Sequence, residues 1–285
     1  MANNPAPITA RLTVTAPTGT APDLLAAATG LSKIAVKEAM AKGAVWLQRP
    51  GRKERRIRKA GFALLAGDHI ALYYDPAVLA LAPETPLLLT NERYYSVWYK
   101  PANLLSQGSR YGDHCSLLRY AEKLKEVGTT ARLVHRLDRE ARGLVLLAHG
   151  RQAAAALSTM LQTRAIEKRY RAEIHGILGP PGEVVICDAP LDGKAARTLV
   201  TVREVCEDLG TSRVDILLET GRYHQIRRHL SRLGHPLVGD RRYGAGNDGI
   251  GLQLVACSLA FKCPFTGRQR RYSLDDDGSA AGLRR

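Results

Sequence analysis

The chain has 285 residues, enough for a small module and a larger domain. Hydrophobic residues make up 45% of it, so a buried core is available, and the formal net charge of +15 favours a polyanionic partner. Five scattered cysteines without a CxxC pair are not the pattern of a disulfide framework or a zinc site. The start, MANNPAPITARLTV, does not look like a signal peptide, and no apolar run approaches the ~20 residues of a membrane span. We therefore expect a cytoplasmic protein.

The first 90 residues are predicted to contain a small module between two less regular stretches. Residues 1–20, rich in Pro, Thr and Ala, are expected to be an extended or flexible lead-in. Two short helices, a basic turn and a closing strand are predicted over residues 22–30, 32–43, 49–59 and 67–74. Ser32 is the expected N-cap of the second helix, and Gly43 follows its end. The module is placed at residues 21–75, and the prolines of residues 76–90 indicate a linker.

After residue 90 the sequence predicts a larger domain of mixed secondary structure. Apolar-rich strands are expected over residues 94–100, 133–138, 143–148, 168–176, 213–221, 254–261 and 268–274. Helices are expected over residues 115–128, 151–164 and 224–234. This mixture is mostly β with interspersed helices, so the predicted fold class is α+β. The domain is placed at residues 91–275, and the tail, residues 276–285, is expected to be disordered.

The segment LVHRLDREARG, residues 133–143, places a carboxylate among three arginines between two apolar strands. The surrounding cations are expected to keep Asp138 ionised, as a nucleophile or a general base requires. A salt-bridged surface turn is the alternative. The apolar flanks favour a functional site, because they imply that the turn emerges from the core and that its side chains have limited freedom.

Two further segments carry candidate functional residues. Residues 220–230 are a glycine turn that leads into a helix rich in Arg and His. Arg227 and Arg228 can grip phosphate or pair with a carboxylate, and a solvated basic face is the alternative. In the strand segment Lys168-Arg169-Tyr170, the tyrosine is either a packing residue or a platform on which a base stacks.

Together these segments resemble the RluA-type pseudouridine synthases over roughly residues 90–275. Residues 135–139 reproduce the family's His-Arg-Leu-Asp-Arg motif, and residues 168–170 match its Lys-x-Tyr strand. Residues 221–227 match its Gly-Arg-Thr-His-Gln-Ile-Arg motif, except that Tyr223 replaces threonine. The segments SVWYKPANLLSQG and GHPLVGDRRYG also fit the family. Where the family continues Asp-Thr-Ser-Gly, this chain reads Glu140-Ala141-Arg142-Gly143, so we expect activity with an altered substrate choice.

The resemblance implies a catalytic domain with a mixed, mostly antiparallel sheet that isomerises uridine in RNA to pseudouridine without a cofactor or metal. It implies that Asp138 is the catalytic aspartate and that Tyr170 stacks on the flipped base. Arg227 is expected to pair with Asp138, and Arg136 to enter the space that the base leaves. Whether Asp138 attacks the sugar or removes a sugar proton stays open. Further RNA contacts are expected from Arg139, Arg222, His224, Gln225 and Arg228.

The N-terminal module resembles the alpha-L RNA-binding motif in its paired helices, its turn at residues 43–45 and its closing Gly-Asp-His-Ile. Residues 49–59 contain seven Lys and Arg residues, which suit phosphate contact, with a solvated loop as the alternative. The expected contacts there are Arg52, Lys53, Arg55 and Arg56. The expected partner of the whole protein is RNA, ribosomal RNA more than transfer RNA, with no membrane role and a monomeric state.

Two other functions remain alternatives at this stage. A non-catalytic RNA-binding or ribosome-assembly protein explains the charge and the module, but it needs no carboxylate among phosphate-binding cations. A hydrolase acting on a nucleoside or sugar usually places two carboxylates at the bond. Here only Asp138 has a motif around it, although Glu140 is near in sequence.

Overall fold

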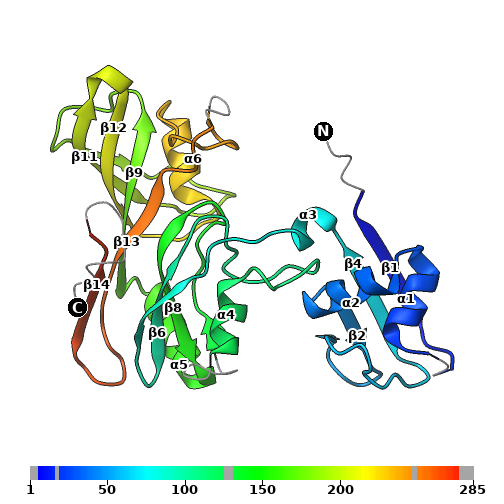
Figure 1. Ribbon diagram of the computed structural model, residues 1–285. Coiled ribbons are helices and arrows are strands. Elements are labelled where there is room, and N and C mark those ends of the chain that lie inside the picture. The colour runs from blue at the N-terminus through cyan, green and yellow to red at the C-terminus, as the bar shows by residue number, and fades with distance from the viewer. Residues whose placement is uncertain (1–5, 17–18, 125–130, 245–248, 276–285) are drawn as a thin grey trace. The chain divides into compact units, whose positions relative to one another are not determined.

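The computed structural model describes residues 6–16, 19–124, 131–244 and 249–275 (Figure 1). The chain divides into two compact units: Met1–Pro83 with Gln107–Tyr120, and Glu84–Ser106 with Ala121–Arg285. The tail that was expected to be disordered lies outside the described residues. No helix in the described part of the chain is long and apolar enough to cross a membrane.

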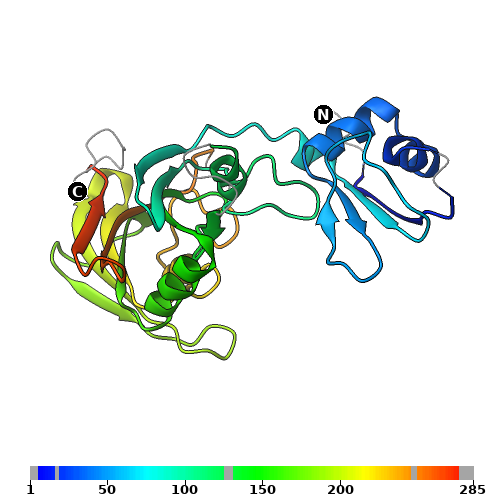
Figure 2. The same ribbon diagram turned by 90° about the horizontal axis from the view of Figure 1, so that it is seen from below.

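The N-terminal unit is a four-stranded antiparallel sheet with two helices against it (Figure 2). Its strands run in the order β1-β4-β2-β3. The elements are β1 (Ile8–Thr13), α1 (Ala21–Thr29), α2 (Lys33–Ala41), β2 (Val45–Gln48), β3 (Arg55–Arg56), β4 (His69–Tyr74) and α3 (Pro76–Leu79). Ser32 accepts a hydrogen bond from the backbone N–H of Ala35, as an N-cap does. Leu25, Val36 and Met40 of the helices are buried in the core of this unit.

The predicted extended or flexible lead-in contains a regular strand, Ile8–Thr13. This segment pairs with β4 along its whole length, from Ile8 with Tyr74 to Thr13 with His69. The pairing satisfies backbone N–H and C=O groups that β4 would otherwise leave open on that side. The predicted linker also contains regular structure, because it includes α3 and the beginning of β5 (Leu87–Asn91).

A segment distant in sequence, residues 107–120, also belongs to the N-terminal unit. The indole N–H of Trp46 donates to the carbonyl of Arg110 at 2.9 Å, and Arg56 donates to the carbonyl of Ser109 at 2.6 Å. Arg58 forms an ion pair with Asp113 in the same segment. The unit is therefore built from two separate stretches of the chain, which a boundary near residue 75 does not capture.

The larger unit is built on a ten-stranded sheet in the order β10-β11-β12-β9-β13-β8-β6-β5, with β14 paired to β13 and β7 to β8. Its further strands are β6 (Tyr95–Lys100), β7 (Ala131–Leu133), β8 (Arg142–His149), β9 (Ile166–His175), β10 (Val184–Cys187), β11 (Thr198–Cys206), β12 (Thr211–Leu218), β13 (Leu254–Lys262) and β14 (Gln269–Ser273). Its helices are α5 (Gly150–Gln162), the short 3-10 helix η2 (Glu207–Leu209) and α6 (Gln225–Arg232), and α4 (Leu117–Lys123) spans the boundary between the units. Every neighbouring pair is antiparallel except β8 with β13. The predicted α+β class with a mixed, mostly antiparallel sheet is confirmed.

The parallel pair β8–β13 fixes where the Asp138 turn leaves the sheet. Ala256 of β13 pairs with Gly143 at the start of β8. Gly143 has φ +120°, and a Cβ there would collide with the backbone of Ala256, so only glycine allows this approach. Behind it, Leu144 and Leu146 are fully buried in the core. The turn that carries Asp138 is therefore anchored to the middle of the sheet.

Candidate active site

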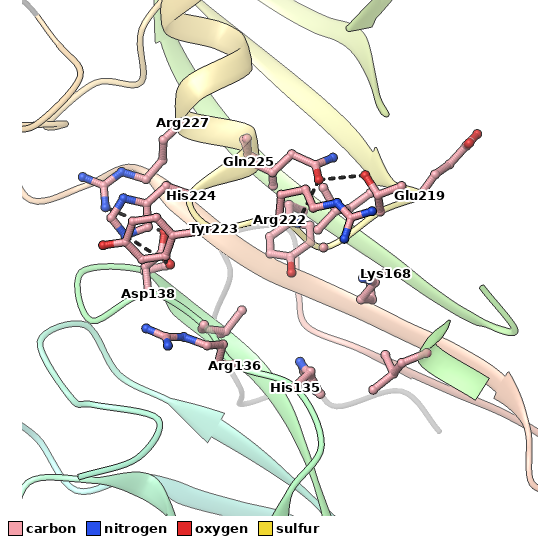
Figure 3. A pocket seen from close by; sticks show the side chains of 18 of the residues that line it. His135, Arg136, Asp138, Lys168, Glu219, Arg222, Tyr223, His224, Gln225 and Arg227 are labelled. Carbon is pink, nitrogen blue, oxygen red and sulfur yellow. Dashed lines mark hydrogen bonds and ion pairs between the residues drawn. The ribbon is translucent and has the colours of Figure 1, made fainter. Parts of the chain in front are cut away.

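An open pocket of about 600 Å³ lies in the larger unit, where segments distant in sequence meet (Figure 3). Its walls come from the turn at residues 134–138, from residues 158–164 at the end of α5, from β9, and from residues 218–227, which run from the end of β12 to the start of α6. Asp138, Tyr170 and Arg227, the three residues expected to be catalytic, all line it. Of the expected RNA contacts of this unit, Arg136, Arg222, His224 and Gln225 also line it.

Asp138 faces two basic side chains inside the pocket. Its Oδ1 lies 3.6 Å from Nε2 of His224, and its Oδ2 lies 3.7 Å from Nη1 of Arg227. Burial raises the pKa of Asp138 above its ordinary value, although the charges of His224 and Arg227 act in the opposite direction. The charge of the sequence neighbour Arg136 also lowers this pKa, but less than those of His224 and Arg227. Arg136 lies over the ring of Tyr223 at 6.0 Å, and Arg139 pairs with Glu140.

Arg227 is held principally by another carboxylate, Asp240. Nε and Nη2 of Arg227 each donate to Asp240 at 2.7 Å, the two-point geometry that fixes a guanidinium most firmly. The remaining Nη1 is 3.7 Å from Asp138 and 3.5 Å from Glu140. Burial acts to raise the pKa of Asp240, but the hydrogen bonds that it accepts outweigh burial and hold that pKa below its ordinary value. Asp240 thus orients the arginine that faces Asp138.

The residue that precedes α6, His224, has a left-handed backbone with φ +50°. Nδ1 of its ring lies 3.1 Å from the hydroxyl of Tyr243, and the ring stacks on Tyr223 with centroids 3.7 Å apart. Burial lowers the pKa of His224 more than the charge of Asp138 raises it, which favours the neutral form of the ring. Asp138 therefore lies beside the fixed charge of Arg227 and an imidazole whose neutral form burial favours.

Tyr170 and His135 both lie close to the sheet at this pocket. Tyr170 of β9 is only 7% exposed, and burial raises the pKa of its hydroxyl, so the phenol stays protonated. Nε2 of His135 accepts a hydrogen bond from the backbone N–H of Leu146 at 2.9 Å. Burial lowers the pKa of His135 to about 3, which keeps that nitrogen free to accept. His135 supports the turn beside β8.

Two residues expected to contact RNA are already engaged within the protein. Gln225 is 3% exposed, and its amide makes four hydrogen bonds, to Thr220, Arg222, Arg197 and Thr198. These bonds leave the amide few donors or acceptors for RNA. Gln225 instead holds the glycine turn before α6 in place, which corrects the expectation.

Arg228 forms a two-point pair with Asp192, at 2.8 and 2.9 Å, and does not line the pocket. Arg139 also lies outside the pocket lining, whereas Arg222 keeps its place in the wall and donates to the carbonyl of Ala195.

In the N-terminal unit, the four expected RNA contacts separate into two kinds. Arg52, Lys53 and Arg55 are exposed. Arg56 lies over the ring of Trp46 at 4.1 Å and donates to two backbone carbonyls, so its guanidinium holds the unit together. The expectation that Arg56 is available to RNA is corrected accordingly.

Sequence reasoning gave no role to Asp240, Glu140 or Lys168, all of which the structure places in or beside the pocket. The signal for Asp240 was present in the segment GDRRYG, where an acidic residue follows a glycine within a basic stretch. No local pattern connects it to Arg227.

Comparison with known proteins agrees with this architecture. The RNA pseudouridylate synthase family profile matches residues 94–232. The dual-specificity RNA pseudouridine synthase RluA of Vibrio parahaemolyticus is 35% identical over 212 residues, covering 68% of this chain and 82% of that protein. Ribosomal large subunit pseudouridine synthase C of Buchnera aphidicola is 27% identical over 254 residues, covering 76% and 78%. The solved structure of human RNA pseudouridylate synthase domain containing 1 has the same fold, with a TM-score of 0.57 at 21% identity over 69% of this chain and 86% of that one.

The chain therefore belongs to the RluA-type RNA pseudouridine synthases, which are isomerases. This membership sets aside the two alternatives, a non-catalytic RNA-binding protein and a hydrolase.

Proposed function

We propose that this enzyme isomerises specific uridines of structured RNA, ribosomal RNA in preference to transfer RNA, with Asp138 as the catalytic carboxylate acting on a flipped-out base. The observation that carries the proposal is the placement of Asp138 inside a pocket of about 600 Å³, within 3.7 Å of the fixed guanidinium of Arg227. A uridine stacked in a helix cannot reach such a recess, so the nucleotide must leave the stack.

The other pocket residues receive roles from their positions. Tyr170, in the wall formed by β9, stacks on the flipped uracil. Arg136 enters the space that the base leaves in the RNA. Arg222 in the wall, and Arg139 outside it, contact RNA phosphates. The reaction rearranges one nucleotide without oxidation, so the proposal requires no cofactor.

The N-terminal unit contributes RNA affinity in this proposal, in the manner of an alpha-L module. Its support is the exposure of Arg52, Lys53 and Arg55 on the loop before β3 and at its start. We also propose that the protein acts in the cytoplasm and as a monomer. The ribosomal RNA preference rests on relatives whose names specify the ribosomal large subunit.

The test maps pseudouridines in total RNA from cells that lack the gene and cells that are complemented. Wild type restores at least one site, whereas Asp138→Asn restores none, because the amide keeps the size of the side chain but cannot carry its charge. Asp208→Asn makes the same chemical change at an exposed position of η2 and serves as the matched control, with full restoration expected. Restoration by Asp138→Asn would contradict the catalytic assignment.

A further inference from the structure

Lys168 differs from every arginine that lines the pocket. Arg164 and Arg227 pair with carboxylates. Arg222 donates to a backbone carbonyl, and Arg136 lies over a tyrosine ring. Within the part of the chain that the structure describes, Lys168 has no ion pair and no hydrogen bond from its ammonium group, and burial alone accounts for the lowering of its pKa. Among the described cations of the pocket lining, Lys168 is thus the one whose charged group has no partner within the protein.

The place of Lys168 in β9 puts it in the same wall as Tyr170. The two residues are two positions apart on one strand, so their side chains lie on the same face of the sheet. At about 3.3 Å per residue, their Cα atoms are roughly 7 Å apart. The ammonium of Lys168 lies next to the turn before α6. A Cβ added to Gly221 in that turn would be 3.6 Å from Nζ of Lys168.

Lys168 and Asp138 occupy different ends of the pocket. Figure 3 shows Asp138 beside His224 and Arg227, and Lys168 beyond Arg222 on the other side of the drawn cluster. The charge of Asp138 is not among the causes that shift the pKa of Lys168, which is lowered by burial alone. A nucleotide with its sugar at Asp138 and its base against Tyr170 therefore extends its base edge toward Lys168.

A half-buried ammonium without a counter-charge destabilises the folded protein, because burial removes water that the charge would otherwise bind. A methionine of similar length would fill the same space without this cost. An uncompensated cation of this kind in a concave pocket indicates a group that completes its interactions only when a ligand is bound.

We propose that Lys168 donates a hydrogen bond to a carbonyl oxygen of the target uracil and stabilises the negative charge that this ring acquires when the glycosidic bond breaks. This inference rests on the proposed function. A uracil carbonyl is favoured over a phosphate because Lys168 shares the wall of Tyr170, whereas exposed arginines are available outside the pocket for the backbone.

The chemistry balances without further reagents. When the C1′–N1 bond breaks, its electron pair stays with the base, and the resulting charge is shared by the carbonyl oxygens O2 and O4. The ring turns, C5 forms the new bond to C1′ and loses its proton, and N1 gains a proton. Lys168 keeps its own protons throughout and acts as a charged hydrogen-bond donor, which is strongest where charge develops in the transition state.

The first test measures single-turnover rates at saturating enzyme, with a synthetic RNA hairpin that contains the mapped uridine. Lys168→Met should lower the rate of the chemical step about 10- to 100-fold, the loss expected for one hydrogen bond to a charged group. The rate of Lys168→Gln, which keeps a neutral hydrogen-bond donor, should lie between those of wild type and Lys168→Met. Lys262→Met, at an exposed position of β13, is the matched control and should keep the wild-type rate.

Thermal stability separates this role from a structural one. Removing an unmatched buried charge should leave Lys168→Met at least as stable as wild type. A lower melting temperature, or a variant that does not fold, would overturn the proposal and identify Lys168 as part of the packing.

Modified RNAs then identify the group that Lys168 contacts. Sulfur replaces O2 or O4 in 2-thiouridine or 4-thiouridine at the target, and a methylphosphonate removes the charge of the adjacent phosphate. We expect the effect of Lys168→Met to be non-additive with one thio substitution and additive with the methylphosphonate. Additivity with both thio substitutions, or coupling only to the methylphosphonate, would overturn the proposal. Failure of the proposed function is distinct, because wild-type enzyme would then form no pseudouridine in the hairpin.

Discussion

Arg227→Met tests whether this arginine keeps Asp138 ionised and in place. Nη1 of Arg227 lies 3.7 Å from Asp138, and the other two donors bind Asp240. Two unit charges about 4 Å apart interact by ~4 kcal/mol at an effective dielectric constant near 20. When the arginine is removed, the surrounding side chains relax and water enters the space, and both compensate for part of this lost interaction energy. We therefore expect the chemical step to lose roughly 1.5–3 kcal/mol, or about one to two powers of ten in rate.

The same substitution also affects stability, and a second variant separates the two effects. Arg227→Met leaves the charge of Asp240 buried and unpaired, because the Asp240 side chain has 0% exposure. We expect a destabilisation of about 3–5 kcal/mol. Asp240→Asn in the same chain removes that charge and keeps the oxygen that accepts the backbone N–H groups of Arg242 and Tyr243. The double variant should regain most of the stability but remain slow, because Asp138 still lacks its cation.

The assay is the single-turnover rate at saturating enzyme over a range of pH. Burial already raises the pKa of Asp138, and Arg227 opposes that rise. Without the arginine this pKa rises further, so the fraction of ionised carboxylate at a given pH falls. The acid limb of the rate profile should move to higher pH, and activity should partly recover as pH rises. Arg213→Met on β12, which breaks an exposed pair with Glu204 of β11, is the control and should behave as wild type. An unchanged saturated rate with weaker RNA affinity would refute the reasoning and make Arg227 a phosphate contact.

Two further predictions separate structural from RNA-binding roles. Gln225→Leu should lower the melting temperature and cost roughly 1–3 kcal/mol of stability, because it leaves buried hydrogen-bond partners unsatisfied. A weaker RNA complex with unchanged stability would instead make Gln225 an RNA contact. Replacing Arg52, Lys53 and Arg55 together with serine should flatten the slope of log affinity against log salt by up to about 3, with the saturated rate unchanged. An unchanged slope would show that this loop does not contact phosphate. These substitutions are a cleaner test than removing residues 1–85, which would also strip residues 107–120 of their partners.

The elements that the sequence predicted well are those whose signal is local. The Ala- and Leu-rich face of residues 151–164 indicated a helix, and α5 spans Gly150–Gln162. The apolar run at 254–261 indicated a strand, and β13 spans Leu254–Lys262 with eight buried residues in succession. The motif at Asp138, Tyr170 and Arg227 likewise predicted that these residues belong to one site, and the structure places all three around one pocket.

Elements at the margins of the two sheets were missed because their sequences are not distinctive. β10 carries exposed Val184 and Ile186, and β1 lies in a stretch whose Pro and Thr content indicated flexible chain. Each becomes a strand because a neighbouring strand offers backbone groups that require partners. Residues 107–120 joined the N-terminal unit for a comparable reason, through bonds to Trp46 and Arg56 that no local pattern predicts.

For this protein the sequence by itself determined the family and the fold class, since these depend on short motifs and on patterns that repeat along the chain. Only the tertiary structure decided which side chains of the site bond to one another. Asp240 rather than Asp138 accepts the two-point hydrogen bond of Arg227. The amide of Gln225 is bonded within the protein, and the ammonium of Lys168 has no counter-charge among the described residues. Hydrogen-bond partners and burial come from segments that meet only after folding. The direction of the Asp138 pKa shift is therefore set by burial, which the neighbouring arginines in the sequence do not reveal.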